Sequence, residues 1–428
     1  MRKMRDSGID WIGTIPQDWQ LSKIGSLYAQ RNEKVSDKDY QPLSVTMQGI
    51  LPQLATAAKT NDGDNRKLVR VGDFAINSRS DRRGSCGISP LDGSVSLINI
   101  ILTPRTAMHP GYYNWLFHTT LFADEFYKWG HGIVADLWTT RWQEMKSITV
   151  PVPEYAEQER IAAFLDAECA EIDAVLEKTR ASIEEYKKLK QAIITQAVTK
   201  GIRGDRPMKD SGIEWIGEIP AGIPISRAGL HFDIVLGKML CSAPVDDNYT
   251  LESYYCAADV HFEGLSNGEK KKMWFSPDEK EQYCVKNGDL LVVEGGAGAG
   301  GCAIAVSTDV PIYIQNSIMI VRSKGISNIR YLRYLLECLV KKGYIDVVCN
   351  KATIPHFTKD KLANVPFIVF SQSDQEEIAE YLNEKCTGID ALIAKKQQYL
   401  TEIGNYKKSL IYEYVTGKKE VKTSVLAD

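Results

Sequence analysis

The sequence lacks the features that mark membrane-spanning and secreted proteins. Its 428 residues contain no apolar run as long as the ~18 residues of a transmembrane helix. The N-terminus, MRKMRDSGID, is charged and has no apolar stretch behind it, so we do not expect a secretory signal. The nine cysteines are scattered without a C-x-x-C pair, which predicts reduced thiols and not a disulfide framework. These absences favour a cytoplasmic protein that has no membrane partner.

Signatures of catalytic and metal-binding sites are also missing. The six histidines show neither H-x-x-x-H nor H-E-x-x-H spacing, and no G-x-S-x-G or H-R-D motif occurs. A G-x-G-x-x-G pattern is present at Gly296, Gly298 and Gly301, but a strand-like run, CAIAVS, follows it instead of the helix that a dinucleotide-binding turn requires. We therefore expect a glycine-rich loop between two strands here. No catalytic residue, metal site or bound cofactor is predicted in this chain.

The sequence does contain a long internal repeat. The phrase DSGIDWIGTIP at Asp6–Pro16 returns as DSGIEWIGEIP at Asp210–Pro220, with nine of eleven residues identical. A second block starts with EQERIAAFLD at Glu157 and returns as DQEEIAEYLN at Asp374, 217 residues later. The order of phrase, variable region and block thus occurs twice, which predicts an internal duplication with a pseudo-twofold relation between its halves.

Both blocks have the pattern of long helices that pack through a seam. Residues 157–200 contain neither proline nor glycine, and apolar positions alternate at steps of four and three, as in a coiled coil. The predicted seam residues are Leu165, Ile172, Leu176, Ile183 and Ile193 in the first block and Leu382, Ile389, Ile393, Leu400 and Leu410 in the second. Ser373 with Glu376 predicts a capping box at the start of the second helix. Two long antiparallel helices are therefore expected.

The variable regions read as mixed α/β. Strands are predicted in five runs: Lys67–Asn77, Val95–Leu102, Gly288–Val293, Ala303–Val306 and Tyr313–Val321. Short helices are predicted over Tyr112–Phe126 and Ile329–Lys341. The predicted fold class is α/β (α+β), with two mixed domains separated by the two long helices.

Basic and hydroxyl side chains gather in loops of both halves. Arg79, Arg82 and Arg83 occupy one loop of the first half, and Thr139, Thr140 and Arg141 precede its long helix. Lys351, Thr353 and His356 take the corresponding place in the second half. Such side chains bind phosphates and base edges, although a solvated surface would look the same. We interpret these nine residues as candidate DNA contacts.

The order of these motifs resembles the DNA specificity subunit of type I restriction–modification systems over the whole chain. The opening phrases begin each recognition domain, EQERIAAFLD and DQEEIAEYLN open the helices, and AVTKG and YVTGK close them. The resemblance implies that each domain reads one half of an asymmetric, bipartite site in double-stranded DNA. It also implies helices that set the gap and dock two methyltransferase subunits, with restriction/translocase subunits able to join. S-adenosylmethionine and ATP/Mg are then expected on those partners, and the chain itself is a non-catalytic subunit of an adenine-N6 methyltransferase.

The resemblance supplies domain boundaries and leaves two alternatives to weigh. The boundaries are 1–152 for the first target-recognition domain, 153–203 for the first spacer helix, 204–371 for the second domain, 372–420 for the second helix and 421–428 for the tail. One alternative is a coiled-coil assembly scaffold that binds no DNA, although it would not need two divergent domains. The other is a fused pseudo-dimeric enzyme, which would need matching acid, base or metal residues in both halves.

Overall fold

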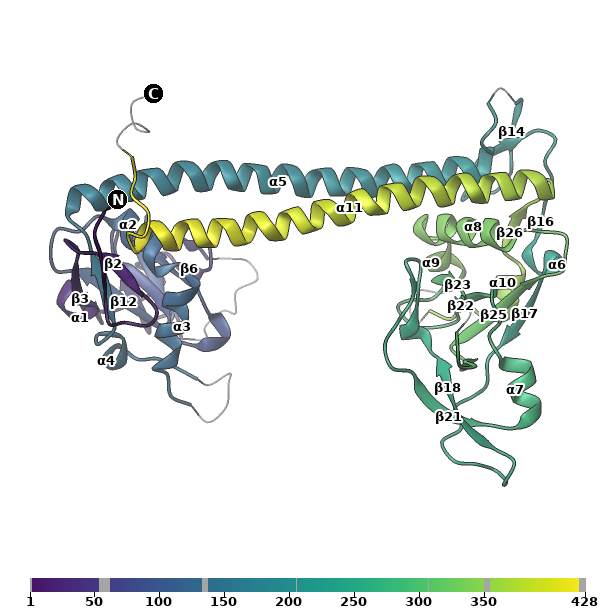
Figure 1. Cartoon of the computed structure of the whole chain (residues 1–428), viewed down its shortest axis with the longest axis horizontal. Coiled ribbons are helices and arrows are strands. Elements are labelled where there is room, and N and C mark those ends of the chain that lie inside the picture. Colours follow the sequence, from purple (N-terminus) through teal and green to yellow (C-terminus); the bar gives the residue numbers. More distant parts are fainter. Residues whose placement is uncertain are drawn as a thin grey trace. The chain divides into compact units, whose positions relative to one another are not determined.

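A computed structural model describes residues 2–53, 62–132, 138–204, 206–306, 308–349 and 355–422 of the chain. It contains two compact units, of which unit 1 comprises Met1–Arg180 and Gln397–Asp428 and unit 2 comprises Ala181–Lys396 (Figure 1). The division falls inside both long helices, α5 (Tyr155–Lys200) and α11 (Gln372–Val415). No helix in the described ranges is long and apolar enough to cross a membrane.

Unit 1 is a mixed α/β domain whose main sheet has four antiparallel strands. In the order of the sheet these strands are β10 (Cys86–Ile88), β9 (Phe74–Asn77), β12 (Asn99–Pro104) and β4 (Tyr28–Arg31). A second sheet has the order β11 (Gly93–Val95), β8 (Arg66–Val69) and β5 (Lys34–Val35). Two-stranded pairs are β1 (Met4–Asp6) with β2 (Thr14–Pro16), β3 (Gln20–Lys23) with β13 (Thr149–Val152), and β6 (Leu43–Thr46) with β7 (Gly49–Pro52). The short helices are α1 (Ile24–Leu27), η1 (Ser80–Arg82), α2 (Pro110–Phe117), α3 (Thr120–Lys128) and α4 (Trp142–Met145).

Unit 2 has a main sheet of the same kind. Its four antiparallel strands follow the order β17 (Phe232–Leu236), β25 (Ile318–Ser323), β22 (Leu290–Val293) and β23 (Cys302–Ile304). A second sheet has the order β21 (Lys271–Phe275), β18 (Thr250–Tyr255) and β24 (Tyr313–Ile314). Two-stranded pairs are β14 (Met208–Asp210) with β15 (Glu218–Pro220), β16 (Ile225–Arg227) with β26 (Pro366–Ile368), and β19 (Val260–His261) with β20 (Gly264–Leu265). The short helices are α6 (Ala228–His231), η3 (Ala257–Asp259), α7 (Pro277–Tyr283), α8 (Ile329–Lys341), α9 (Tyr344–Val348) and α10 (Lys359–Ala363).

The two main sheets agree strand by strand. In each main sheet the first strand along the chain pairs with the fourth, the fourth with the second, and the second with the third. The order is β4-β12-β9-β10 in unit 1 and β17-β25-β22-β23 in unit 2. Cys86 begins β10 and Cys302 begins β23; both are fully buried, and burial raises the pKa of each thiol to about 12. The mixed α/β class predicted from the sequence is therefore confirmed.

The long helices pack against each other in both units, as Figure 1 shows. In unit 1 the rings of Phe164 and Tyr414 lie 4.4 Å apart, and Lys407 Nζ lies 2.6 Å from Asp173 Oδ1. In unit 2 Lys190 Nζ lies 2.7 Å from Asp390 Oδ2. All ten predicted seam residues are buried or half-buried.

Each unit ties its α/β domain to the helices through the same two polar contacts. The first contact is a hydrogen bond from a tyrosine hydroxyl to a carbonyl oxygen near the end of a long helix. In unit 1 Tyr112 of α2 donates to Val415 O, and in unit 2 Tyr331 of α8 donates to Val198 O. A buried glutamine accepts a backbone N–H of the domain, Gln158 from His109 at 2.9 Å and, in the other unit, Gln375 from Asn328 at 2.8 Å.

The repeated phrase forms a β-hairpin in both units. Strand β1 pairs with β2, and β14 pairs with β15 in the matching register. A backbone hydrogen bond closes the loop of each hairpin, from Ser7 N to Gly13 O in unit 1 and from Ser211 N to Gly217 O in unit 2, both at 3.0 Å. Both Gly13 and Gly217 have positive φ, which glycine adopts without steric cost. The second phrase therefore forms the same hairpin as the first.

In unit 1 the phrase is anchored in the core. Trp11 is buried and meets Phe122 edge-on, with ring centroids 5.9 Å apart, while Ile12 and Ile15 are fully buried. In unit 2 Ile216 and Ile219 are buried, while Trp215 is half-buried. In both units the phrase therefore contributes apolar side chains to the core.

Five expectations about local structure need correction. The predicted strands Val95–Leu102 and Tyr313–Val321 are each interrupted by a turn, which separates β11 from β12 and β24 from β25, and the predicted helix Tyr112–Phe126 is two helices, α2 and α3. The run Lys67–Asn77 is two strands and not one, because Gly72 turns the chain at φ +86° and the buried Asp73 binds Arg31 at 2.7 Å. The second long helix begins at Gln372, and its cap is Ser371, whose Oγ accepts from Asp374 N at 3.1 Å. The predicted capping box of Ser373 and Glu376 is therefore wrong, since both residues already lie inside the helix.

Candidate nucleic-acid interface

The arginine loop of unit 1 connects the two strands β9 and β10 at the end of the main sheet. Asn77 closes β9 and accepts the backbone N–H of Arg79 through its side-chain Oδ1 at 3.0 Å. This contact lets the chain leave the sheet at an exposed position, and Arg79 then pairs through an antiparallel bridge with Thr139. Two segments that lie sixty residues apart in the sequence are thus brought together.

A cavity of about 370 Å³ lies at this junction. Its walls include four of the predicted residues, Arg79, Thr139, Thr140 and Arg141. Lys67 and Gln30 line it as well, together with Ser78, Leu97, Ile98, Ile100 and Trp142. The cavity therefore combines cationic donors, amide and hydroxyl groups and an apolar wall, which are the groups that contact phosphates and base edges.

Thr140 has a positioning role. It is fully buried, its Oγ1 donates to Phe126 O at 2.9 Å, and its N–H donates to Ser78 O at 3.0 Å. Its hydroxyl is thus used within the domain, where it fixes the 138–142 segment to helix α3 and to the end of β9. Arg141 is exposed next to it, and its backbone N–H donates to Glu144 Oε2 at 3.0 Å.

Arg82 and Arg83 lie outside the lining of this cavity. Arg83 forms an ion pair with Asp124 of α3, and both side chains are half exposed. Arg82 is the more accessible, and its guanidinium lies 3.7 Å from Asp81. Of the three loop arginines, Arg79 is therefore the one that faces the cavity.

Unit 2 repeats this backbone frame with different side chains. Gly295 bridges His356 in the antiparallel sense, as Arg79 bridges Thr139, and Phe357 N donates to Glu294 O as Thr140 N does to Ser78 O. His356 is exposed, and its Nδ1 lies 3.3 Å from Glu294 Oε2. Lys351 and Thr353, the other two candidates of this half, lie outside the described residues.

The glycine-rich segment Glu294–Gly301 joins β22 to β23, so it is the loop between strands expected from the sequence. Gly300 there has φ +81°, and a Cβ at this position would lie 2.9 Å from side-chain atoms of Ile345 and Val340. Close packing against these two side chains therefore explains why position 300 is a glycine. Within the described parts of the chain, no three His, Cys, Asp or Glu side chains group so as to hold a metal ion.

Sequence reasoning missed Lys67 and Gln30. Lys67 Nζ donates to Asn99 O at 2.6 Å, and burial lowers the pKa of its ammonium. Lysine is rarely buried, so a lysine inside a strand of buried residues could have identified Lys67 as a candidate site residue. Gln30 carries no such local signal, since only the pairing of β4 with β12 brings it to the cavity.

The comparisons with known proteins agree with this architecture. Residues 263–402 match the family model described as type I restriction modification DNA specificity domain. The type I restriction enzyme MjaVIII specificity subunit of Methanocaldococcus jannaschii is 24% identical over 434 residues, covering 95% of this chain and 94% of the relative. The putative MjaX specificity subunit of the same organism is 24% identical over 293 residues, which cover 65% of this chain and 61% of the relative.

Two solved structures share the fold. One is a chain from a study of complex assembly and conformational transition in a type I R-M system, with a TM-score of 0.73 and 16% identity over 95% of this chain and 99% of that one. The other is the HsdS subunit of Thermoanaerobacter tengcongensis, with a TM-score of 0.54 and 17% identity over 95% and 98%. The class defined by the fold is a mixed α/β protein carried on two long helices.

Sequence and fold comparisons point to the same family. The resemblance inferred from the repeated motifs is thereby confirmed. The chain is similar to the DNA specificity subunits of type I restriction–modification systems, in sequence over most of its length and in fold.

Proposed function

We propose that each unit reads one half of a bipartite site in double-stranded DNA. The observation that carries this proposal is the shared backbone frame with exchanged side chains. One bridge presents Arg79 and Thr139, and the corresponding bridge presents Gly295 and His356. A common frame places each reading surface equivalently, while different side chains recognise different bases.

We infer further that the chain is an internal duplication whose helices form an antiparallel coiled coil with a pseudo-twofold relation. Two ion pairs support this inference. Lys407 with Asp173 in unit 1 and Lys190 with Asp390 in unit 2 exchange places under the 217-residue offset of the repeat. Recognition domains 1–152 and 204–371, helices 153–203 and 372–420 and a tail 421–428 remain the proposed boundaries.

The helices are proposed to set the gap between the half-sites and to dock two methyltransferase subunits. Those subunits would carry S-adenosylmethionine and methylate adenine, and restriction/translocase subunits would use ATP and Mg²⁺. This chain would supply recognition and no chemistry.

The DNA contacts proposed for unit 1 are Arg79, Arg82, Arg83, Thr139 and Arg141, with Arg79 the strongest because it faces the cavity. For unit 2 they are Lys351, Thr353 and His356. Each phosphate contact releases counterions, so the logarithm of the binding constant falls with the logarithm of salt concentration by about 0.9 per contact.

The test is a salt titration of DNA binding by the chain in complex with its methyltransferase. Arg79→Ala should weaken binding to the cognate duplex and lower the salt slope by about one. Arg70→Ala is a suitable control, because Arg70 is also an exposed arginine of unit 1 but lies against Asp92 and Tyr40, away from the cavity. An unchanged slope for Arg79→Ala, or the same change in both variants, would contradict the proposed contact.

A further inference from the structure

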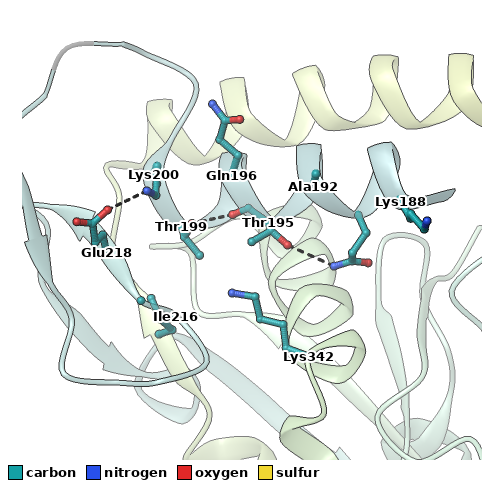
Figure 2. Close-up of a pocket in the computed structure, with 11 residues that line it drawn as sticks. Lys188, Ala192, Thr195, Gln196, Thr199, Lys200, Ile216, Glu218 and Lys342 are labelled. Atoms are coloured by element: carbon teal, nitrogen blue, oxygen red, sulfur yellow. Dashed lines mark hydrogen bonds and ion pairs between the residues drawn. The ribbon is translucent and has the colours of Figure 1, made fainter. Parts of the chain in front are cut away.

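Unit 2 has an open groove along the last three turns of α5, shown in Figure 2. Its volume is about 820 Å³. The helix supplies one wall, the second phrase supplies another, and Lys342 at the end of α8 completes it. The lining comprises Lys188, Gln191, Ala192, Thr195, Gln196, Thr199, Lys200, Ile216, Gly217, Glu218 and Lys342.

The corresponding place in unit 1 is filled by the chain itself. Tyr412 occupies the helix position equivalent to Thr195, and its hydroxyl lies 2.9 Å from Ile12 O. Lys418, which corresponds to Gly201, donates from Nζ to the same carbonyl and to Thr14 O at 3.2 Å. What remains there is a cavity of about 330 Å³ bordered by Tyr412 and Ile411. The open groove is thus a property of unit 2 and not of the repeat.

Its floor is made of small and apolar groups. Thr199 and Ile216 are buried, and Thr195 is half-buried, with Oγ1 3.4 Å from Cys338 Sγ. The helix residues that line the groove recur at steps of three and four from Lys188 to Thr199, so they form one stripe about 17 Å long at ~1.5 Å per residue. A stripe of this length fits a segment of polypeptide.

The rim of the groove is positively charged. It carries Lys188, Lys200 and Lys342 against the single carboxylate of Glu218. Glu218 lies 3.0 Å from Lys200 Nζ (Figure 2), while Lys342 Nζ donates to Trp215 O at 2.8 Å. Lys188 is also paired with Glu185, which lies outside the lining, so the rim keeps an excess of one positive charge, and this favours an occupant with carboxylates.

We propose that this groove binds a carboxylate-bearing segment of the methyltransferase subunit, and that the two halves of the chain therefore hold their methyltransferases unequally. The inference rests on the proposed function, because it takes the methyltransferase as the partner. The segment would lay apolar side chains on the floor and place acidic side chains beside the rim lysines. DNA is the other polyanion available to these lysines, but an apolar floor along a helix suits a peptide better.

A pair of neighbouring lysines provides the test. Lys188 pairs with Glu185 and Lys187 with Glu184, both at 2.8 Å and both three residues apart on α5, but only Lys188 lines the groove. Lys188→Glu and Lys187→Glu thus have the same local effect on the helix. Binding of labelled methyltransferase to the full chain should weaken about five- to tenfold for Lys188→Glu, from loss of one attraction and gain of one repulsion. Lys187→Glu should leave it unchanged.

A second variant tests the groove by volume. Thr195→Tyr introduces the residue that unit 1 carries at the equivalent position, and it should weaken the tighter of the two methyltransferase sites to the affinity of the other, as measured by titration with native mass spectrometry. Equal affinities for Lys188→Glu and Lys187→Glu, with two unequal methyltransferase sites retained in Thr195→Tyr, would overturn the inference and leave the proposed function intact. Weaker DNA binding with unchanged methyltransferase binding would assign the groove to DNA and also overturn it. A wild-type chain that binds no methyltransferase would overturn both proposals.

Discussion

A substitution at Gly417 tests what holds the first repeated phrase, Asp6–Pro16, against the end of α11. The residue follows α11 at φ +70°, and a Cβ added there would lie 2.5 Å from the Pro16 ring and 3.0 Å from Trp19 Cη2. Gly417→Ala should therefore combine a backbone cost of about 1–2 kcal/mol for a left-handed alanine with a packing cost of about 1–3 kcal/mol. We expect the free energy of unfolding to fall by roughly 2–5 kcal/mol, the sum of these two costs.

Gly201 provides the matched control for this substitution. It follows α5 at φ +79°, but a Cβ there would meet nothing closer than Phe370 Cε1 at 3.5 Å. Gly201→Ala should lose only the backbone cost, about 1–2 kcal/mol. Urea denaturation of both variants, with hydrogen exchange in the hairpin of residues 4–16, measures the difference. Equal losses of stability in the two variants, or no faster exchange in this hairpin for Gly417→Ala, would show that the contact with Pro16 does not hold the phrase in place.

Two further predictions concern a buried carboxyl and the long helices. Burial raises the pKa of Glu337, whose unfolded value is near 4.5, despite its ion pair with Arg333. The folded state then favours the protonated form, so the contribution of Glu337 to stability falls as pH rises above about 4.5, and Glu337→Gln should gain stability relative to wild type between pH 4 and pH 8. A constant difference in chemical denaturation across this range would contradict the assignment. One heptad inserted at matching places in α5 and α11 adds roughly 10 Å to each helix. Because DNA rises ~3.4 Å per base pair, the gap in the recognised site should widen by about three base pairs. An unchanged gap in mapped methylation sites would refute the spacing role.

The sequence predicted those parts of the fold that depend on neighbouring residues. Helical periodicity is local, so α8 was predicted with the bounds it has, Ile329–Lys341, and the two long helices were predicted to within a few residues. The break after β8 was missed because its cause is distant. Asp73 is fixed by Arg31, which lies 42 residues earlier, and no pattern in the run Lys67–Asn77 reveals that partner.

The same limit applies to the candidate site. Charge clustering predicted Arg79 and Arg141, which line the cavity, but it could not separate Arg79 from Arg83, which forms an ion pair with Asp124 of α3. It also could not distinguish Thr139 from buried Thr140. The open groove of unit 2 depends on a difference between two aligned positions, Thr195 and Tyr412. The sequence could not predict this groove, because it does not reveal that the repeated phrase lies next to the end of the helix.

The central claim is that two units of one chain read two separate half-sites. Mapping methylated adenines in cells that express the chain with its methyltransferase tests it most directly. The account predicts a bipartite motif with a constant unread gap, and it predicts that substitution of Arg79, Arg82 and Arg83 alters methylation through one half only. A single continuous motif, or simultaneous change in both halves, would contradict it.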